Sequence, residues 1–168
     1  MTDHDRTNPA ASLFTVSAEV QPQWIDYNGH MNMGYYVVAF DELSTDAWFT
    51  SLDIGAEHFK RCNNSTFTLG CNIDYLREVF AGDRLRLTTQ LIDYDHKRLH
   101  YYHCMYNEDK DYLAATNECL TLYVDMETRR STSFDPDYMQ RFEQELQRGQ
   151  AHGMPAGFGR KLGIRRSS

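Results

Sequence analysis

Polar residues of the kinds used in catalysis gather in one short segment, residues 26–32. The segment holds Asp26, Asn28, His30 and Asn32, directly before a long stretch with an apolar pattern. A carboxylate can act as a general base on water, or it can attack a carbonyl carbon itself. An imidazole titrates near neutral pH and can shuttle a proton, or it can orient a loop through hydrogen bonds. The composition of this segment favours acyl chemistry, with Asp26 as its only carboxylate.

The stretch that follows, residues 35–55, is predicted to be a helix of about five turns. Its large apolar residues recur at three- and four-residue spacing and form one face: Tyr36, Val37, Phe40, Leu43, Ala47, Trp48 and Leu52. Asn32 is suited to cap the first turn, and Gly55 to end the helix. The first turn of a helix offers unpaired amides and the positive end of the helix dipole. Such amides polarise a carbonyl group and stabilise the oxyanion that forms on attack.

The remaining elements are predicted to be antiparallel strands. Residues 13–20 suggest a first strand, and after residue 63 the apolar period changes to two. The later strands are expected at residues 65–80, 84–95, 98–108 and 112–128, and a short helix follows over residues 137–148. Short turns join these strands, and parallel neighbours would need long crossovers. One long helix against one antiparallel sheet is an α+β architecture. Because one helix covers one face, we expect a partner chain on the other.

Length and composition indicate one domain with polar ends. The chain has 168 residues, of which 41% are hydrophobic and 13% aromatic, enough for a single core. We expect a flexible N-terminal arm over residues 1–12, the folded domain over residues 13–148, and a basic tail over residues 149–168. The tail carries four positive charges, whereas the whole chain carries a net charge of −7. We expect the tail to be disordered or to lie on a partner.

Charge and motifs disfavour several classes of function. A net charge of −7 argues against nucleic acid as a partner, because binding to a duplex depends on neutralising phosphates. No apolar stretch approaches 18 residues in length and the N-terminus is polar, so we expect a cytoplasmic protein with no membrane partner. The four cysteines form no CxxC pair, and we expect reduced, buried thiols. His100 and His103 lie three apart in a strand and so face opposite sides, which disfavours a metal site.

The segment WIDYNGHMNMGYYVVAFDE, which begins at Trp24, resembles the signature of the hotdog-fold acyl-CoA thioesterases, specifically the 4-hydroxybenzoyl-CoA thioesterase-like group. That group shows Asp-x-x-Gly-His-Val-Asn-Asn-x-x-Tyr at this point. The residues of this chain that fall on the pattern are Asp26, Gly29, His30, Asn32 and Tyr36. Met31 replaces the valine conservatively. Met33 replaces the second asparagine, a departure from the pattern that can change the residues lining the pocket wall. The order of the later elements also agrees, so the resemblance covers roughly residues 14–145.

The resemblance implies a hotdog fold, in which a curled antiparallel sheet wraps around one long central helix. It implies hydrolysis of an acyl-CoA, with Asp26 as general base or nucleophile and the backbone amide of Met33 as the donor to the thioester oxygen. His30 would orient the loop or shuttle a proton, and Asn32 would cap the helix or position water. No metal and no cofactor apart from the substrate's own coenzyme A is expected. The expected assembly is a homodimer or homotetramer.

Substrate contacts are expected from the same loop and from arginines. Tyr27, Asn28 and Gly29 are candidates to face the acyl group. Arginines can clamp phosphates through two hydrogen bonds, although each could equally be a solvated surface charge. The candidates for the phosphates of coenzyme A are Arg77, Arg129 and Arg130.

The acyl group is expected to be short, and polar or aromatic. Aromatic residues are frequent in the loop and helix, and aromatic faces can surround a quaternary ammonium group. The sequence also resembles the thioesterase branch linked with carnitine breakdown, which acts on betainyl-CoA. Two alternatives stay open: a hotdog dehydratase or hydratase, and a non-catalytic acyl-CoA-binding module.

Overall fold

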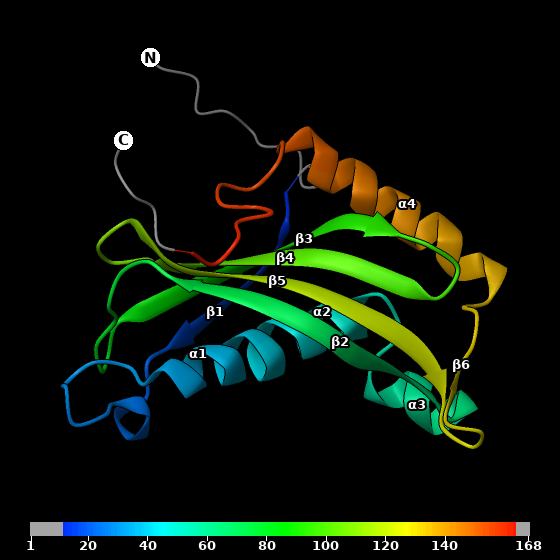
Figure 1. Ribbon diagram of the computed structural model, residues 1–168, viewed down its shortest axis with the longest axis horizontal. Coiled ribbons are helices and arrows are strands. Elements are labelled where there is room, and N and C mark those ends of the chain that lie inside the picture. The colour runs from blue at the N-terminus through cyan, green and yellow to red at the C-terminus, as the bar shows by residue number, and fades with distance from the viewer. Residues whose placement is uncertain (1–11, 164–168) are drawn as a thin grey trace, which may run out of the picture.

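The computed structural model describes residues 12–163, so all of the expected N-terminal arm except Ser12 lies outside the described residues. Within this range one antiparallel sheet curls around a long helix (Figure 1). Its strands are β1 (Phe14–Glu19), β2 (Asn64–Tyr75), β3 (Arg84–Tyr94), β4 (Arg98–Asn107), β5 (Tyr112–Asp125) and β6 (Arg130–Ser131). Their order is β1-β3-β4-β5-β2, with β6 beside β5. Every pair is antiparallel, as the short turns predicted.

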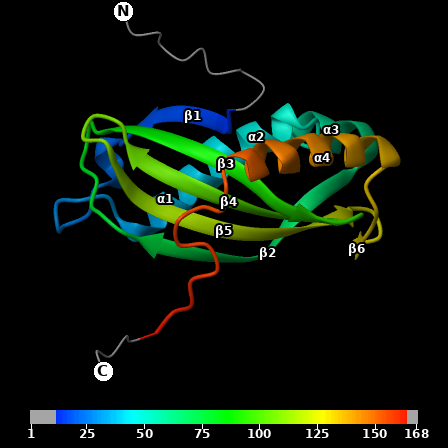
Figure 2. The same cartoon turned by 90° about the horizontal axis from the view of Figure 1, so that it is seen from above.

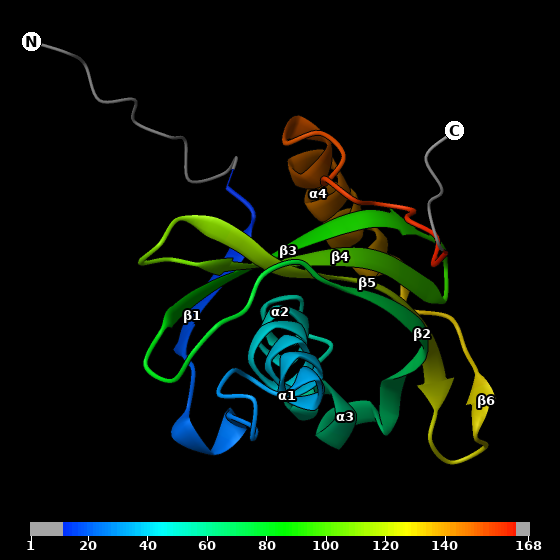
Figure 3. The same cartoon turned by 60° about the vertical axis from the view of Figure 1, so that its left-hand side comes forward.

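The central helix runs without a break from Met33 to Ser51 and lies in the concave face of the sheet (Figure 3). It consists of α1 (Met33–Val38), a π-helical segment (Ala39–Thr45) and α2 (Asp46–Ser51). Large apolar side chains from this helix are fully buried, among them Phe40 and Trp48. Burial of each such side chain contributes about 1.5–3 kcal/mol. The apolar face predicted from the sequence therefore fixes the helix, and with it the position of its N-terminus.

The helix ends earlier than the sequence predicted. Gly55 is the N-cap of a further short helix, α3 (Ala56–Cys62), which was not predicted. A Cβ atom at Gly55 would lie 2.7 Å from the Oγ1 atom of Thr50, so a side chain does not fit where the chain turns back. This close approach, rather than a helix stop, explains the glycine.

The π-helical segment directs two hydroxyl groups at a buried histidine. Thr45 Oγ1 lies 3.0 Å from Nε2 of His103, and Ser44 Oγ lies 3.3 Å from its Nδ1. Thr89 Oγ1 is a second neighbour of Nδ1, at 3.0 Å. Burial lowers the pKa of His103 to about 3, so the ring is neutral. Hydrogen bonds to both ring nitrogens offset the cost of burying this polar side chain.

Strand β2 is shorter than the predicted strand over residues 65–80. It ends at Tyr75, because the amides of Leu76 and Arg77 both donate to the carbonyl oxygen of Ala114, at 2.9 and 3.0 Å. Two donors on one acceptor interrupt the regular ladder of an antiparallel pair. Residues 76–80 therefore leave the sheet and pass beside the start of α1.

The outer face of the sheet is partly covered by this chain itself. A helix α4 (Pro136–Ala151) packs along β3, and its Tyr138 hydroxyl donates to the carbonyl oxygen of Asp53. Residues 152–163 then run across β4, β5 and β2 (Figure 2). The expected domain boundary at residue 148 falls inside α4. Of the expected basic tail, residues 149–151 belong to α4 and residues 152–163 lie on the sheet of the same chain, whereas residues 164–168 lie outside the described residues.

The cysteines differ from the expectation of buried thiols. Cys104 and Cys119 are buried, whereas Cys62 and Cys71 are exposed, and all four are free. His100 and His103 do face opposite sides of the sheet, as their spacing predicted. His103 points at the central helix, and His100 pairs with Glu118 on the outer face at 2.9 Å.

Candidate active site

The loop before α1 folds into a small hairpin. A β-bridge pairs Ile25 with Met31, and the amide of Asp26 donates to the carbonyl oxygen of His30 at 3.0 Å. A turn closes the hairpin, in which the amide of Gly29 donates to the carbonyl oxygen of Asp26. Gly29 has a φ of 83°, a conformation that glycine adopts without strain. These bonds hold the polar residues of the segment in one fixed arrangement beside the helix.

Asp26 uses only one of its carboxylate oxygens inside the hairpin. Its Oδ1 accepts the amide hydrogen of Asn28 at 2.8 Å, the geometry of an Asx-turn. No donor among the described residues reaches the other oxygen, and the residue is only partly buried. One oxygen thus orients the carboxylate, and the second is free to accept a proton.

The start of α1 presents one free amide. Asn32 is the N-cap, as predicted, and its side chain accepts the amide hydrogen of Gly34 at 2.9 Å. The amide of Tyr35 donates to the carbonyl oxygen of Asn32. The Met33 amide has no acceptor among the described residues. Because the dipole of the helix adds positive potential at this end, the Met33 amide is suited to bind an oxyanion.

A cleft of about 220 Å³ lies at this end of the helix. One wall comes from the loop and helix start, and the other from the end of β2 and the segment after it. The lining residues are His30, Met31, Met33, Tyr36, Tyr75, Leu76, Arg77 and Glu78. The Tyr75 hydroxyl donates to the carbonyl oxygen of Met33 at 3.2 Å and ties the two walls together. Of the predicted site residues, His30, Met33 and Arg77 line the cleft.

His30 joins the two walls in a second way. Its Nδ1 lies 3.1 Å from the carbonyl oxygen of Met31, which can only accept, so this nitrogen carries the proton. Its Nε2 faces Oε1 of Glu78 at 3.8 Å. These contacts support an orienting role for His30, one of the two roles that the sequence left open.

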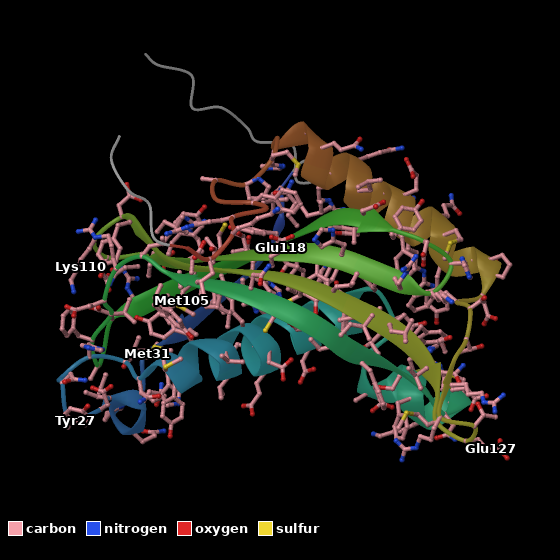
Figure 4. All side chains as sticks on the ribbon, in the orientation of Figure 1. Tyr27, Met31, Met105, Lys110, Glu118 and Glu127 are labelled. Atoms are coloured by element: carbon pink, nitrogen blue, oxygen red, sulfur yellow. The ribbon has the colours of Figure 1, made fainter. Side chains whose placement is uncertain are left out.

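Other predicted residues lie at the rim or far from the cleft. Tyr27, at the tip of the hairpin, is 97% exposed and points away from the protein (Figure 4). Asn28 and Gly29 are exposed in the same turn and do not line the cleft. Arg129, in the β5–β6 connection, and Arg130, the first residue of β6, lie at the opposite end of the sheet, close in sequence to the labelled Glu127 (Figure 4). Within one chain, the structure does not bring these two arginines to the cleft.

The aromatic residues divide between core and cleft. Phe40 and Trp48 are fully buried, and Trp24 stacks on Tyr35 with ring centroids 5.9 Å apart. Tyr36 and Tyr75 line the cleft with their rings at 86° and centroids 5.2 Å apart. Burial raises the pKa of Tyr36 to about 12, so its hydroxyl stays protonated.

Tyr75 and Glu78 were not predicted as site residues. No pattern in the sequence pointed to them, apart from their being an aromatic and an acidic residue near the end of a predicted strand. Among the described residues, no group of three or more His, Cys, Asp or Glu side chains could hold a metal ion. No described helix is long and apolar enough to span a membrane.

Comparison with known proteins identifies the family. Residues 20–142 match the model of the Thioesterase-like superfamily. The chain is 33% identical over 152 residues to a betainyl-CoA thioesterase of Pseudomonas aeruginosa, a match that covers 90% of this chain and 95% of that protein.

Two solved structures are also similar. A hypothetical protein from Staphylococcus aureus, solved in complex with CoA, has a TM-score of 0.85 and 28% identity, and the match covers 92% of this chain and 97% of that one. A candidate thioesterase from Pseudomonas putida KT2440 has a TM-score of 0.80 and 29% identity, and the match covers 92% of this chain and 99% of that one. The chain therefore belongs to the Thioesterase-like superfamily and is a thioester hydrolase with the hotdog fold that the sequence resemblance implied.

Proposed function

We propose that this protein hydrolyses acyl-CoA thioesters in the cleft at the start of α1, and that betainyl-CoA is its substrate. The observation that carries the proposal is the unpaired Met33 amide in a cleft directly beside the hairpin that holds Asp26. A thioester carbonyl bound at the amide would be polarised there. The free oxygen of the Asp26 carboxylate would act on the attacking water.

In this mechanism the water oxygen bonds to the carbonyl carbon while Asp26 takes a proton from the water. The carbonyl oxygen becomes an oxyanion and accepts a hydrogen bond from the Met33 amide. The C–S bond then breaks, the acid is released, and the thiolate of CoA takes up a proton. In the second route an Asp26 oxygen attacks the carbonyl carbon first, the C–S bond breaks, and the CoA thiolate leaves and takes up a proton. Water then opens the resulting anhydride, which releases the acid and restores the Asp26 carboxylate. Both routes need the same two groups.

The lining of the cleft supports a cationic acyl group. The betainyl group carries a quaternary ammonium, which binds favourably to aromatic faces. Tyr36 and Tyr75 present two rings at right angles in the cleft, and the Glu78 carboxylate supplies a negative charge at the same wall. The relative in Pseudomonas aeruginosa bears the name of this activity.

We further propose that the protein works as a dimer formed through β2. This strand is one of the two edges of the sheet, the other being β1, and its residues 67–72 are exposed. Leu69 is 54% and Phe67 40% exposed, which is unusual on an edge that does not bind a partner. Two copies related by a twofold axis would extend the sheet by pairing β2 with β2 in antiparallel fashion.

Such a dimer also supplies the arginines that one chain lacks at its cleft. Antiparallel pairing puts the start of one β2 beside the end of the other. The start of β2 pairs with Asp125, which in turn pairs with Arg130, whereas the end of β2 leads into Arg77. Arg129 and Arg130 of a second copy would thus approach Arg77 at the mouth of the cleft. Phosphates of CoA are the ligand that this grouping fits.

A panel of CoA esters tests the activity. Release of free thiol is measured with betainyl-CoA, acetyl-CoA, a benzoyl-CoA and 3,3-dimethylbutyryl-CoA, the last being a neutral isostere of the betainyl ester. We expect the highest kcat/KM with betainyl-CoA. Crotonyl-CoA is added to detect hydration of a double bond. Hydration without thiol release would instead favour a hydratase, and tight binding without release would favour a binding module.

A further inference from the structure

The segment after α4 crosses the outer face of the sheet and is fixed on each strand that it passes. On β3, the side-chain amide of Gln90 donates to the carbonyl oxygens of Gly149 and Gly153, at 2.9 and 2.8 Å. On β4, the Tyr102 hydroxyl donates to the carbonyl oxygen of Ala156 at 3.2 Å. We call residues 152–163 the C-terminal strap.

The strap is also fixed on β5 and β2. The amide of Gly159 donates to Oε2 of Glu118 at 3.1 Å, and this carboxylate is held by His100 as well. On β2, Nη1 of Arg160 lies 3.4 Å from Oδ2 of Asp74. The anchors therefore follow the strand order β3-β4-β5-β2, and the strap reaches the free edge of the sheet in a defined position.

The packing of Phe158 makes this path specific. Its ring lies 5.5 Å from the His100 ring and 6.0 Å from the Tyr102 ring, centroid to centroid. At Gly157 the backbone has a φ of 88°, and a Cβ atom there would lie 3.2 Å from the Tyr102 hydroxyl. A segment held by ring contacts, hydrogen bonds and an ion pair is a built part of the fold.

The end of the strap lies close to the cleft wall in the fold. Asp74, the partner of Arg160, directly precedes Tyr75, which lines the cleft. In Figure 2 the strap leaves the sheet beyond β2, toward the end where α1 begins. Lys161 is exposed, and the next residue, Leu162, is completely exposed. Two cationic side chains thus stand at the edge of the sheet, on the far side of β2 from the Tyr75 ring.

We propose that the C-terminal strap holds Arg160 and Lys161 as binding residues for the phosphates of the CoA nucleotide. This inference rests on the proposed function. The cleft has a volume of about 220 Å³, below the range of about 300–1,000 Å³ of pockets for drug-sized ligands, so we place the nucleotide of CoA outside it. Asp74 fixes the Arg160 guanidinium through one end, and the remaining N–H groups are free to bind phosphate oxygens. Arg77 adds a third positive charge from the segment that follows β2.

The test separates nucleotide binding from hydrolysis. The variant Arg160→Ala/Lys161→Ala is compared with the unmodified protein by calorimetric titration with adenosine 3′,5′-bisphosphate, the phosphorylated end of CoA. We expect the Kd to rise at least about fivefold, as the loss of charge-assisted hydrogen bonds requires. In turnover assays kcat/KM for betainyl-CoA should fall by a similar factor through KM, whereas kcat/KM for betainyl-pantetheine, which has no nucleotide, should not change.

Arg98→Ala is the matched control. Arg98 is also an outer-face arginine paired with an aspartate, Asp95, but it belongs to the opposite end of its strand from the region of the cleft. It should leave both measurements unchanged. Equal Kd values for the double variant and the unmodified protein, or no binding of the nucleotide by the unmodified protein, would overturn the inference. If the nucleotide binds as expected but no thioester is hydrolysed, the proposed function fails and the phosphate site stands.

Discussion

At the scale of single residues, the candidate site depends on which polar groups the fold leaves unpaired. Two groups near the start of α1 have no hydrogen-bond partner among the described residues, the second oxygen of Asp26 and the amide of Met33. Asn32 satisfies the amide of Gly34 and thereby leaves the Met33 amide as the free donor of the first turn. The same cap that stabilises the helix therefore leaves unpaired the amide that we propose as the donor to the thioester oxygen.

Tyr75 is the residue through which acyl specificity can be tested. Tyr75→Leu removes one ring that we propose for the quaternary ammonium. A cation–π contact contributes about 0.5–2 kcal/mol, so the preference for betainyl-CoA over neutral 3,3-dimethylbutyryl-CoA should fall by roughly 2- to 30-fold. The ratio of the two kcat/KM values measures this. Tyr75→Phe keeps the ring, loses only the hydrogen bond to Met33, and should retain the preference. An unchanged ratio in Tyr75→Leu would exclude the ring as the cation site.

Most of the predicted residues near the cleft are close in sequence. Asp26, His30, Asn32 and Met33 lie in one short segment, so their chemistry and spacing were visible. Of the second wall only Arg77 was predicted, because the strand pattern in the sequence continues past Tyr75. The two amides that share one acceptor, and so end the strand, are a tertiary feature.

At the scale of elements, the central helix is fixed by its apolar face and by one polar cluster. Ser44 and Thr45 of the π-helical segment contact His103 on β4, and Thr89 on β3 contacts it as well. A run of this kind carries one more residue per hydrogen-bonded turn than an α-helix, and it is uncommon. The apolar period in the sequence could not reveal the π-helical segment. The segment is only seven residues long, too short to change the three- and four-residue spacing of the apolar residues visibly.

This cluster predicts a dependence of stability on pH. The pKa of His103 is about 3 in the folded protein, against the ordinary value of 6.5, because of burial. The unfolded chain therefore binds a proton below pH 6.5 while the folded protein does not. Stability is fully present above pH 6.5 and is lost as the pH falls. Between pH 7 and pH 5 the free energy of unfolding should fall by up to about 2 kcal/mol through this group. Burial also lowers the pKa of His58, which adds in the same direction.

Urea unfolding at the two pH values measures the effect. In His103→Asn the difference between pH 7 and pH 5 should shrink by about 1–2 kcal/mol, even though the variant is less stable at both values. His96→Asn changes an exposed histidine and should leave the difference as it is. The same difference in the His103 variant and the unmodified protein would show that the buried ring is not the source.

The strands and the two longer helices were predicted because periods of two and of three to four are local properties of the chain. The short elements, α3 and β6, and the path of the C-terminal strap were not. The strap residues carry no apolar period and many glycines, which on their own indicate disorder. Their order comes from contacts with Gln90, Tyr102 and Glu118, on three different strands.

At the scale of the whole molecule, one chain presents the exposed edge of β2 at one side of the sheet. The outer face, which the sequence led us to assign to a partner chain, is instead partly covered by α4 and the C-terminal strap. The edge of β2 remains as the surface for a second copy. The proposed dimer links assembly to activity, because Arg129 and Arg130 lie far from the cleft of their own chain and would approach a cleft only in a second copy.

A charge on the edge strand tests the assembly. Leu69→Lys places an ammonium group at the middle of β2, where paired copies would have to bury two of them. We expect a monomer by light scattering and a raised KM for CoA esters. Leu120→Lys introduces the same charge on β5, which is not an edge strand, at a leucine that is 36% exposed. It should remain dimeric. Equal masses for both variants and the unmodified protein would refute an interface through β2.

The most direct test of the account is the turnover of Asp26→Asn. This change keeps the size of the side chain and an oxygen that can accept the Asn28 amide, so the hairpin and the free energy of unfolding should be preserved. A general base or nucleophile contributes about 10²–10⁴-fold to the rate. We predict that kcat for betainyl-CoA falls by at least about 10²-fold while binding of CoA is unchanged. Turnover within a fewfold of the unmodified protein, in a variant that folds and binds CoA normally, would contradict the proposed role of Asp26.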